Sequence, residues 1–337
     1  MKLFISGGSG FLGRALVERF YDSCDRIVVY SRSEARQAEM KAIYPEYPDN
    51  KLRYYLGDVR DVSRLCQAMH GCDTVIHAAA QKRVETCALD VGECIRTNVL
   101  GTWNVANACT INKVSKAIFV SSDKASSPIT AYGKSKALGE DIWIQSNNIH
   151  PTKFGCVRYA NVQGSTGSLL QIWKKQIESG LSITITDRRM TRMWLTVQEA
   201  AQHIMSSLSQ IVAGGEIVLP VCHASSVYDM ARGLVDEYHI EEIGMRPYEK
   251  LHEQMINEGD ARQCYYQPES QTFVIYPTIH DWVRKIDKKG ILIPESMRYE
   301  SNNMEEVLGW IGHIPPMETS PEKYITTQAP TTVLNPD

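Results

Sequence analysis

A glycine-rich turn near the start of the chain constrains the fold more than any other feature of the sequence. The apolar run KLFIS (2–6) predicts a buried strand, GGSGFLG (7–13) follows it, and the amphipathic segment 11–23 predicts a helix. Glycines in such a turn let the backbone approach a pyrophosphate, which binds the free N–H groups at a helix N-terminus. This strand–turn–helix order predicts a dinucleotide site rather than a tight turn without a ligand.

Short apolar runs alternate with helical patterns over the first 165 residues. Strands are predicted at 2–6, 26–31, 51–58, 73–80, 116–122 and 153–162, and helices at 11–23, 62–69, 98–110 and 131–146. Because the strands are apolar on both faces, they predict an α/β fold with a parallel, doubly wound sheet of the Rossmann type.

The regular alternation weakens after residue 165, where helices are predicted at 169–180 and 197–212 and a short strand at 182–187. We therefore expect residues 1–165 to form the dinucleotide-binding domain and residues 166–315 to form mainly a smaller substrate-binding cap. The segment 316–337 is rich in Pro and Thr and is expected to be a flexible tail.

Composition excludes several classes of protein. The net charge of -3 over 337 residues argues against a general nucleic-acid surface. No apolar run approaches the roughly 18 residues of a membrane span, and the N-terminus lacks the pattern of a signal peptide. The nine cysteines show no C-x-x-C spacing, which favours reduced thiols over disulfides or a metal site. We expect a cytoplasmic protein without a metal.

The end of the second predicted strand indicates which nicotinamide cofactor binds. NAD enzymes usually carry an acid there for the ribose 2′-OH, but this strand ends in YSRS and no carboxylate follows until Glu34. Arg32, helped by Ser31 and Arg14, suits a 2′-phosphate, so NADP is favoured over NAD unless Arg32 is a solvated loop residue. The predicted cofactor contacts are Gly7, Gly10, Phe11, Leu12, Gly13, Ser31, Arg32, Asp58 (at the adenine edge), Val59, Ala78, Ala79, Ala80, Tyr132 and Lys136.

The pair Tyr132-x-x-x-Lys136 is typical of oxidoreductases. The two residues are four apart on a predicted helix and therefore share one face. A nearby ammonium and a nicotinamide cation are expected to lower the pKa of Tyr132, so that the phenolate acts as a base on a substrate hydroxyl.

A second acid and base, Asp123 and Lys124, precede this pair. Loss of water next to a ketone needs an acid for the leaving hydroxide and a base for the adjacent C–H, which Asp123 and Lys124 provide. Lys124 must be neutral for this role, which a partly buried site beside other cations would favour. The alternative is a solvated surface turn, but ligands bind at the carboxyl ends of such strands.

Several motifs occur in the order found in a known family. GGSGFLG, SSDKASSPITAYGKSK, VRYANVQGSTGS, ITDRRMTRMWLT and IGMRPYEKLHE resemble UDP-N-acetylglucosamine 4,6-dehydratases of the extended short-chain dehydrogenase/reductase superfamily. The resemblance spans about residues 1–265 and is closest to the C5-inverting enzymes of the pseudaminic acid pathway. It implies oxidation at C4, loss of water across C5 and C6, hydride return to C6 and reprotonation of C5 from the opposite face. NADP is recycled in this scheme and is expected to stay tightly bound.

The resemblance also implies residue roles. Asp123 becomes the acid for the C6 hydroxyl, Lys124 the C5 base, Tyr132 and Lys136 the redox pair, and Ser122 the partner of the C4 oxygen. For a UDP-sugar, arginines are expected at the two phosphates and a carboxylate suits a ribose diol. The predicted substrate contacts are Lys82, Asn161, Arg192, Arg246 and Glu249, whereas Trp194 is expected to be core.

Two other functions stay open. A UDP-sugar 4-epimerase shares the fold, but epimerisation needs no elimination machinery such as Asp123 and Lys124. A catalytically silent NADP-binding sensor is disfavoured by the intact catalytic set. Relatives form dimers and often hexamers, so a homo-oligomer is expected, and neither nucleic acid nor membrane is expected as a partner.

Overall fold

The computed structural model describes residues 1–45, 47–48, 50–149, 151–165, 167–280 and 286–312. The predicted tail at 316–337 lies outside these residues. Within them, ten strands form one large sheet in the order β16-β14-β15-β10-β6-β5-β4-β1-β2-β3. Their bounds are β1 (Lys2–Ser6), β2 (Arg26–Ser31), β3 (Leu52–Leu56), β4 (Thr74–His77), β5 (Lys116–Val120), β6 (Lys153–Val157), β10 (Ile217–Pro220), β14 (Cys264–Gln267), β15 (Thr272–Ile275) and β16 (Ile291–Leu292).

The sheet is parallel from β3 to β10 and antiparallel beyond it. Phe4 in the centre of β1 pairs with Val28 on one side and Val75 on the other. The strand order reverses between β1 and β4, which is the point where doubly wound sheets bind ligands at the strand carboxyl ends. This arrangement confirms the predicted Rossmann-type fold.

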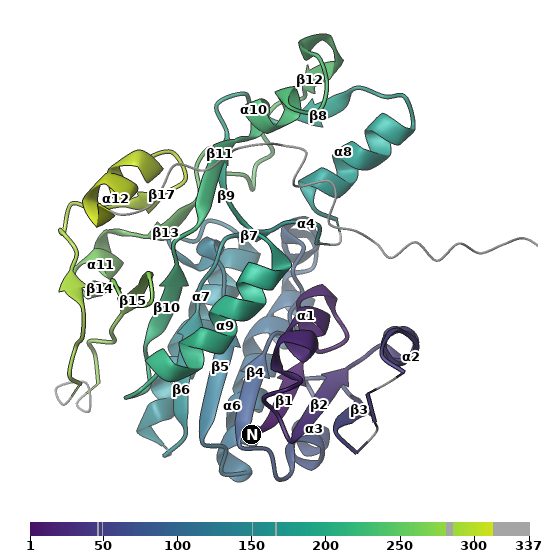
Figure 1. Cartoon of the computed structure of the whole chain (residues 1–337), viewed down its shortest axis with the longest axis vertical. Coiled ribbons are helices and arrows are strands. Elements are labelled where there is room, and N and C mark those ends of the chain that lie inside the picture. The colour runs from purple at the N-terminus through teal and green to yellow at the C-terminus, as the bar shows by residue number, and fades with distance from the viewer. Residues whose placement is uncertain (46, 49, 150, 166, 281–285, 313–337) are drawn as a thin grey trace, which may run out of the picture.

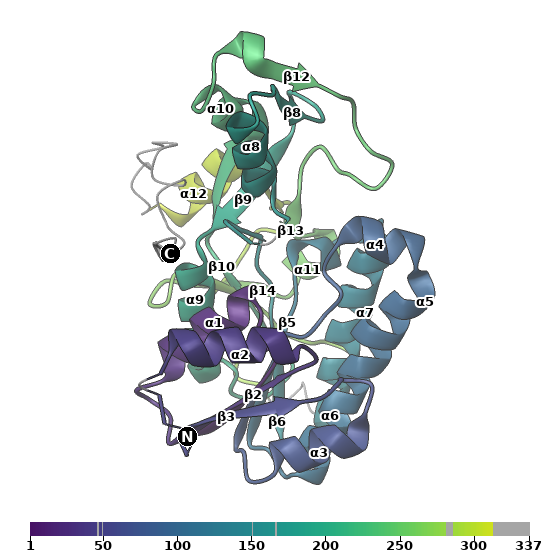
Figure 2. The same ribbon diagram turned by 90° about the vertical axis from the view of Figure 1, so that its right-hand side faces the viewer.

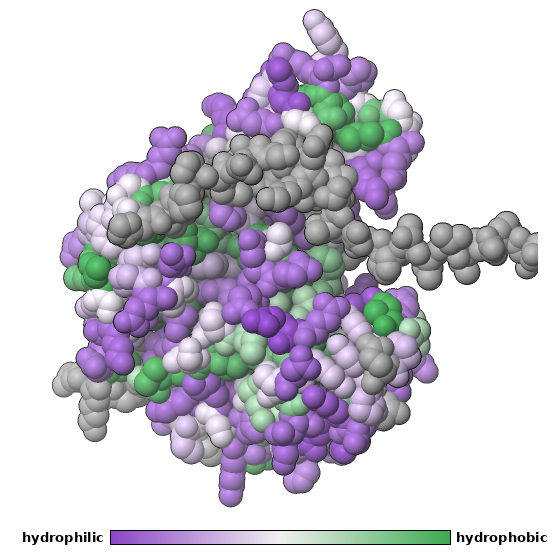
Figure 3. Space-filling model, viewed as in Figure 1, coloured by the Kyte–Doolittle hydropathy of each residue, from purple (hydrophilic) through white to green (hydrophobic). Residues whose placement is uncertain are grey.

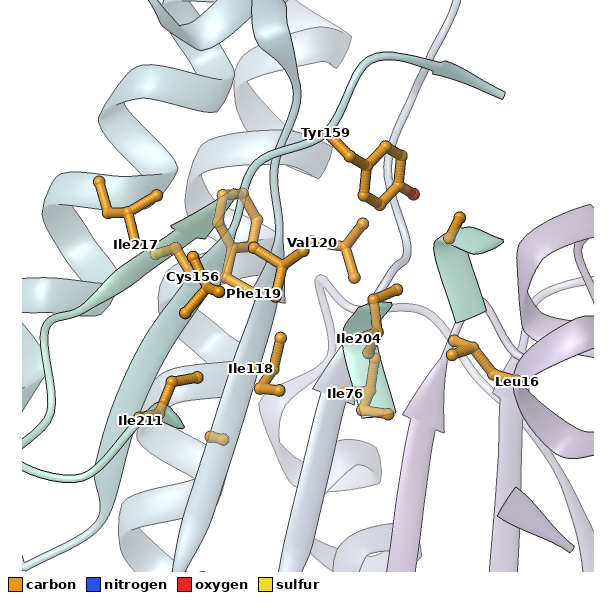
Figure 4. Packing of buried hydrophobic residues seen from close by; sticks show 14 of the residues in the cluster. Leu16, Ile76, Ile118, Phe119, Val120, Cys156, Tyr159, Ile204, Ile211 and Ile217 are labelled. Carbon is orange, nitrogen blue, oxygen red and sulfur yellow. The ribbon is translucent and has the colours of Figure 1, made fainter. Parts of the chain in front are cut away.

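Helices cover both faces of the sheet (Figures 1 and 2). One face carries α1 (Phe11–Phe20), α2 (Glu34–Ile43) and α9 (Val197–Gln210), and the other carries α3 (Val62–Met69), α6 (Gly101–Ile111) and α7 (Ala131–Gln145). The core lies between these layers. Figure 4 shows Ile204 of α9 beside Ile76 of β4, with Ile118 of β5 on one side of them and Leu16 of α1 on the other. Burying each such side chain stabilises the fold by about 1.5–3 kcal/mol.

A smaller unit with its own core lies at the top of the molecule in Figure 1. Trp173, Ile183 and Trp194 are buried in this core, as the sequence predicted for Trp194. Its elements are α8 (Leu169–Glu178), β8 (Ile183–Ile185), β9 (Thr191–Leu195), β11 (His223–Ser226), α10 (Val227–Arg232), η4 (Glu237–His239) and β12 (Ile240–Glu242). On the face shown in Figure 3, apolar residues gather on this unit while most of the surface is hydrophilic.

Short elements complete the described chain. They are α4 (Val84–Leu89), α5 (Val91–Cys94), η1 (Ile95–Leu100), η2 (Asp123–Ala125), η3 (Ser146–Asn148), β7 (Asn161–Val162), β13 (Gln254–Ile256), α11 (Glu258–Ala261), β17 (Tyr299–Glu300) and α12 (Met304–Ile311). No helix within the described ranges has the length and apolar character needed to cross a membrane.

Several observed elements differ from the predicted ones. The strand predicted at 153–162 ends at Val157, and the next residue, Arg158, forms a buried ion pair with Glu140. Residues Asn161–Val162 pair with β9 instead. The first three residues of the helix predicted at 98–110 belong to the π-helical segment η1, and the α-helix begins only at Gly101. Helix α2 was not predicted, since its pattern has only Gln37 and Met40 buried.

The chain after residue 165 contributes to the large sheet as well as to the upper unit. It returns to the large sheet as β10, β14, β15 and β16, and α9 packs against α1. The division of function at residue 165 therefore stays a prediction, while the segments that follow it contribute to both parts of the molecule.

Candidate active site

The carboxyl ends of the central strands open into a cleft of about 760 Å³. Most residues that the sequence assigned to the cofactor and the chemistry line this cleft. They are Gly7, Gly10, Phe11, Leu12, Gly13, Ser31, Arg32, Val59, Ala78, Ala79, Ala80, Ser122, Asp123, Lys124, Tyr132 and Lys136. Lys82 and Asn161 also line it, whereas Asp58, Arg192, Arg246 and Glu249 lie outside this lining.

The glycine turn is shaped for a phosphate. Gly7 has a φ of 73°, and a Cβ there would lie 2.9 Å from the backbone nitrogen of Ala79. A Cβ on Gly13 would lie 2.4 Å from the carbonyl oxygen of Gly8, so only glycine lets α1 approach β1 this closely. No side chain caps the N-terminus of α1 at Gly10, which leaves its N–H groups free for an anion.

A buried histidine fixes the strand ends around this turn. Nδ1 of His77 lies 2.6 Å from Oγ of Ser6, and Nε2 lies 3.0 Å from Oγ1 of Thr102. Burial holds the pKa of His77 at about 3, so the ring is neutral and serves as a structural link. The N–H of Ala79 donates to Oγ of the same Ser6, which positions the small-residue bend against the turn.

Two arginines lie at the end of the cleft that the sequence analysis assigned to a ribose 2′-phosphate. Ser31, Arg32 and Arg36 line one end of the cleft, and Oγ of Ser9 donates to Oγ of Ser31 over 2.8 Å. Asp58, predicted at the adenine edge, instead accepts hydrogen bonds from the Arg60 backbone and guanidinium, at 2.9 and 2.6 Å. Arg36 was not singled out from the sequence, because the helix α2 that carries it was not predicted.

Tyr132 and Lys136 are one helical turn apart, and burial shifts their pKa values in opposite directions. Burial raises the pKa of Tyr132 to about 12, although the Lys124 charge opposes this shift. Nζ of Lys136 donates to the carbonyl oxygen of Val120 at 2.6 Å, and burial lowers the pKa of this lysine to about 8. The predicted lowering of the Tyr132 pKa by Lys136 is therefore wrong for the protein groups alone; a nicotinamide cation would have to supply it.

Asp123 and Lys124 form an ion pair inside the cleft, not a solvated turn. Asp123 is 1% exposed, and its carboxylate lies 3.1 Å from Nζ of Lys124. The short segment η2 brings both side chains together directly after β5, with Ser122 donating to Oδ1 of Asp123 at 2.7 Å. Figure 4 shows Val120, the last residue of β5, beside Tyr159 at the cleft end of the core.

The charge of Lys124 differs from the prediction. Burial lowers its pKa, but the negative charges of Asp123 and Glu253 outweigh burial and raise the pKa above the ordinary value of a lysine. The expectation of a neutral Lys124 beside other cations is wrong, because carboxylates surround it on two sides. Glu253, whose Oε1 lies 3.2 Å from Nζ of Lys124, was missed although it ends the quoted motif IGMRPYEKLHE.

Of the predicted substrate residues, Lys82 and Asn161 reach the cleft. Oδ1 of Asn161 accepts a hydrogen bond from Nζ of Lys124 at 3.4 Å, and its amide donates to the Met193 carbonyl oxygen. Burial and the charges of Arg83 and Arg36 lower the pKa of Lys82. This region is therefore rich in positive charge and suits a phosphorylated ligand.

The three remaining predicted substrate residues bond other parts of the protein and do not line the cleft. Arg192 uses its guanidinium to bond the carbonyl oxygens of Thr191, Leu251 and Lys250. Arg246 lies 3.7 Å from Glu85 of α4, and its backbone N–H donates to Glu249 at 3.0 Å. Their roles as ligands stay predictions.

A π-helical turn, η1, is hydrogen-bonded to helix α7, which carries Tyr132. Asn98, within η1, bonds both backbone groups of Gln81 and donates to Oγ of Ser135 at 3.0 Å. Ser135 in turn donates to the carbonyl oxygen of Tyr132. Such bulges often mark functional sites, and this one joins the bend after β4 to the helix that carries Tyr132.

Known proteins resemble the chain over most of its length. A UDP-N-acetylglucosamine 4,6-dehydratase (inverting) of Campylobacter jejuni is 35% identical over 313 residues, 90% of this chain and 92% of the relative. A UDP-glucose 4-epimerase of Rickettsia rickettsii is 36% identical over 282 residues, 79% of this chain and 82% of the relative. The X-ray structure of Pen from Bacillus thuringiensis has a TM-score of 0.80 at 30% identity and covers 92% of this chain and 96% of its own.

The fold and the cleft together define an extended short-chain dehydrogenase/reductase. Within this class, a family model described as polysaccharide biosynthesis protein matches residues 3–275. The chain belongs to the polysaccharide biosynthesis protein family.

Proposed function

We propose that the protein is a UDP-N-acetylglucosamine 4,6-dehydratase that uses NADP and inverts C5. The observation that carries the proposal is the buried Asp123–Lys124 ion pair, at 3.1 Å, in the same cleft as Tyr132 and Lys136. A redox pair alone suits many alcohol oxidations, but a second acid–base pair suits an elimination. The 35% identical relative named as an inverting dehydratase supports the same reaction and its stereochemistry.

The cleft fits a nicotinamide dinucleotide. The uncapped N-terminus of α1 and the crowded Gly7 and Gly13 leave room for a pyrophosphate but not for side chains. Ser31, Arg32 and Arg36 would hold a 2′-phosphate, which favours NADP over NAD. When bound, NADP supplies reversible acceptance of a hydride from C4 and its return to C6.

Tyr132 acts on the C4 hydroxyl in the first step. Tyr132 takes the hydroxyl proton as the phenolate, which a bound nicotinamide cation would favour, while Ser122 bonds the C4 oxygen. Lys136 supplies a positive charge for this step, and a hydrogen bond to the Val120 carbonyl oxygen fixes the position of its ammonium group. The ketone that results makes the C5–H acidic enough for a side-chain base.

One shared proton makes Asp123 an acid and Lys124 a base. Transfer of the ammonium proton of Lys124 to Asp123 breaks an N–H bond and forms an O–H bond, giving a neutral amine beside a carboxylic acid. Lys124 then takes the C5 proton, and Asp123 protonates the C6 hydroxyl as it leaves as water. The pair ends in its starting charge state, so the resting ion pair is compatible with catalysis.

The substrate contacts belong to the same proposal. Lys82 and Asn161 lie in the cleft near the sugar position, and Arg192, Arg246 and Glu249 are assigned to the diphosphate and ribose of a UDP group. Loop movement would be required for Arg246, which now lies beside Glu85. The product would be UDP-2-acetamido-2,6-dideoxy-β-L-arabino-hex-4-ulose.

We also propose that the protein is a homo-oligomer and that it is located in the cytoplasm. Large apolar side chains are half exposed along η1, α6 and α7, including Leu100 at 50%, Trp103 at 52% and Leu138 at 47%. A second copy of the chain would bury them.

Mass spectrometry and proton NMR of UDP-N-acetylglucosamine after incubation with the protein test the proposed reaction: the mass reports loss of water, and the ring couplings report the configuration at C4. A product lighter by one water supports the dehydratase. A product of unchanged mass with the galacto configuration supports the alternative, a 4-epimerase, which the Rickettsia relative brings into consideration. An unchanged sugar with bound NADP favours the silent sensor.

A further inference from the structure

Glu253 places a second carboxylate beside the Lys124 ammonium, in addition to that of Asp123. Oε1 of Glu253 is 3.2 Å from Nζ of Lys124, compared with 3.1 Å for Oδ2 of Asp123. Glu253 is 4% exposed, and it reaches Lys124 from a segment more than a hundred positions later in the chain. Lys124 is therefore held between two buried carboxylates, of which the proposed reaction uses one.

The backbone, and not the ion pair, determines where Glu253 lies. It directly precedes β13, and its N–H donates to Oγ of Ser301 at 2.9 Å. Its carbonyl oxygen accepts from the Ser301 N–H at 2.8 Å. Arg192 braces the same segment through the carbonyl oxygens of Lys250 and Leu251. Glu253 is thus presented to Lys124 by a rigid support.

The second oxygen of Glu253 has no hydrogen-bond partner among the residues that the structure describes. A buried carboxylate that serves only packing or fold stability normally has both oxygens bonded, since an unsatisfied charged group costs about 1–3 kcal/mol or more. Arg192 comes no closer than 3.9 Å to the other oxygen. The negative charge of Glu253 is therefore left largely for Lys124.

We propose that Glu253 is a positioning residue that holds the Lys124 amine at the cleft and stabilises the ammonium formed when Lys124 takes the C5 proton. This inference rests on the proposed dehydratase reaction. In that reaction the C5–H bond breaks, an N–H bond forms on Lys124, and the C5 electron pair forms the C5–C6 double bond as the C6–O bond breaks. The oxygen leaves as water with the proton from Asp123.

The charge balance gives Glu253 its role. After Lys124 has passed its proton to Asp123, Glu253 is the remaining anion beside the amine. The positive charge that develops on Lys124 in the transition state then forms 3.2 Å from a fixed negative charge. The charged or titratable groups that face Lys124 are Asp123, Glu253, Arg192 and Tyr132, and Glu253 is the anion among them that does not exchange a proton.

The test is Glu253→Gln, which keeps the shape of the side chain and removes its charge. We expect dehydration to slow by about tenfold or more, while C4 oxidation, followed as reduced nicotinamide, continues. Loss of the anion also makes the Asp123–Lys124 pair release its shared proton more readily, so the alkaline limb of the pH–rate profile moves to lower pH. Glu253→Asp keeps the charge and is expected to keep the wild-type limb.

Glu300→Gln is the matched control. Glu300 lies on β17 next to β13 and bonds Gln254 at 2.6 Å, so this variant removes a nearby carboxylate that does not contact Lys124. Its rate and pH profile are expected to match the wild type.

Three results would overturn the inference. They are a wild-type rate and profile in Glu253→Gln, equal losses in Glu253→Gln and Glu253→Asp with an unmoved alkaline limb, and failure of both variants to fold, which would make Glu253 a structural residue. Failure of the proposed function is distinguished separately, because the wild-type protein would then form no dehydrated sugar.

Discussion

Nζ of Lys124 lies 3.1 Å from Oδ2 of Asp123, and the two residues are neighbours in the chain at the end of β5. Adjacent residues in an extended strand point to opposite faces, but the tight turn of η2 directs both side chains into the cleft. A proton can therefore pass within the pair without solvent. The elimination chemistry proposed for the protein depends on this contact.

Removal of the amine of Lys124 should separate the two halves of the reaction. In Lys124→Ala, C4 oxidation continues because Tyr132 and Lys136 are untouched, but water loss falls by at least about a hundredfold. Reduced nicotinamide should accumulate, which ultraviolet absorbance measures in a single turnover. Lys134→Ala, an exposed lysine on the same helix as Tyr132, is the control and should behave as wild type. Dehydration at the wild-type rate in Lys124→Ala would show that the base is another group.

Because Lys136 is buried, we expect its ammonium group to lower the free energy of unfolding by an amount that depends on pH. Its folded pKa of about 8 lies below the ordinary 10.5, so the unfolded chain binds more protons between these pH values. The free energy of unfolding therefore rises with pH across this window. Below the window the folded and unfolded states are both protonated, and burial of the ammonium lowers the free energy of unfolding by its full amount, about 3 kcal/mol. Lys136→Met should be more stable than wild type at pH 7 and lose that advantage as the pH rises.

Urea unfolding of both proteins at several pH values measures this difference. Lys134→Met, exposed on the same helix, is the control and should show no such trend. A difference between Lys136→Met and wild type that is constant with pH would contradict the assigned cause.

The cationic end of the cleft should discriminate between the two nicotinamide cofactors. Arg32→Ala should weaken NADP by about tenfold or more and NAD little, because a charge-assisted contact to the 2′-phosphate is lost. Calorimetric titration of protein stripped of nucleotide gives both dissociation constants. Arg53→Ala, on the exposed side of β3, should change neither. Equal losses for NAD and NADP on Arg32→Ala would remove the argument for a 2′-phosphate site.

A buried ion pair joins helix α7, which carries Tyr132, to the later part of the chain. Arg158 bonds both oxygens of Glu140 on α7, at 3.1 and 2.7 Å, and also Asp260 at 2.7 Å. Glu140→Gln should lower the free energy of unfolding by about 3–5 kcal/mol, because it leaves a buried guanidinium less compensated. Glu39→Gln, which breaks the exposed pair with Arg14, should cost no more than about 1 kcal/mol. Equal urea midpoints for the two variants would contradict this reasoning.

The local parts of the site could be predicted from the sequence because the chemistry depends on near neighbours. The glycines at 7, 10 and 13 follow a strand and begin a helix, and Tyr132 and Lys136 lie one helical turn apart. Spacing of this kind specifies geometry directly, and the structure brings these residues into one cleft. The doubly wound sheet follows in the same way from alternating patterns.

The charge states could not be predicted, since they depend on residues distant in sequence. Lys124 was expected to be neutral, yet Glu253, which comes from the segment before β13, helps to keep it charged. Likewise the antiparallel strands β14, β15 and β16 extend the sheet from a part of the chain without clear periodicity. The pairing of strands distant in sequence and the charge states of buried side chains become apparent only in the three-dimensional structure.

The most direct test of the account is a proton NMR time course of UDP-N-acetylglucosamine with the protein in deuterated water, without added cofactor. The account predicts a new C6 methyl signal with deuterium at C5, since Lys124 exchanges the C5 proton with solvent and the cofactor is recycled. A retained C6 hydroxymethyl group with a change at C4 alone would contradict the proposed elimination and leave a 4-epimerase.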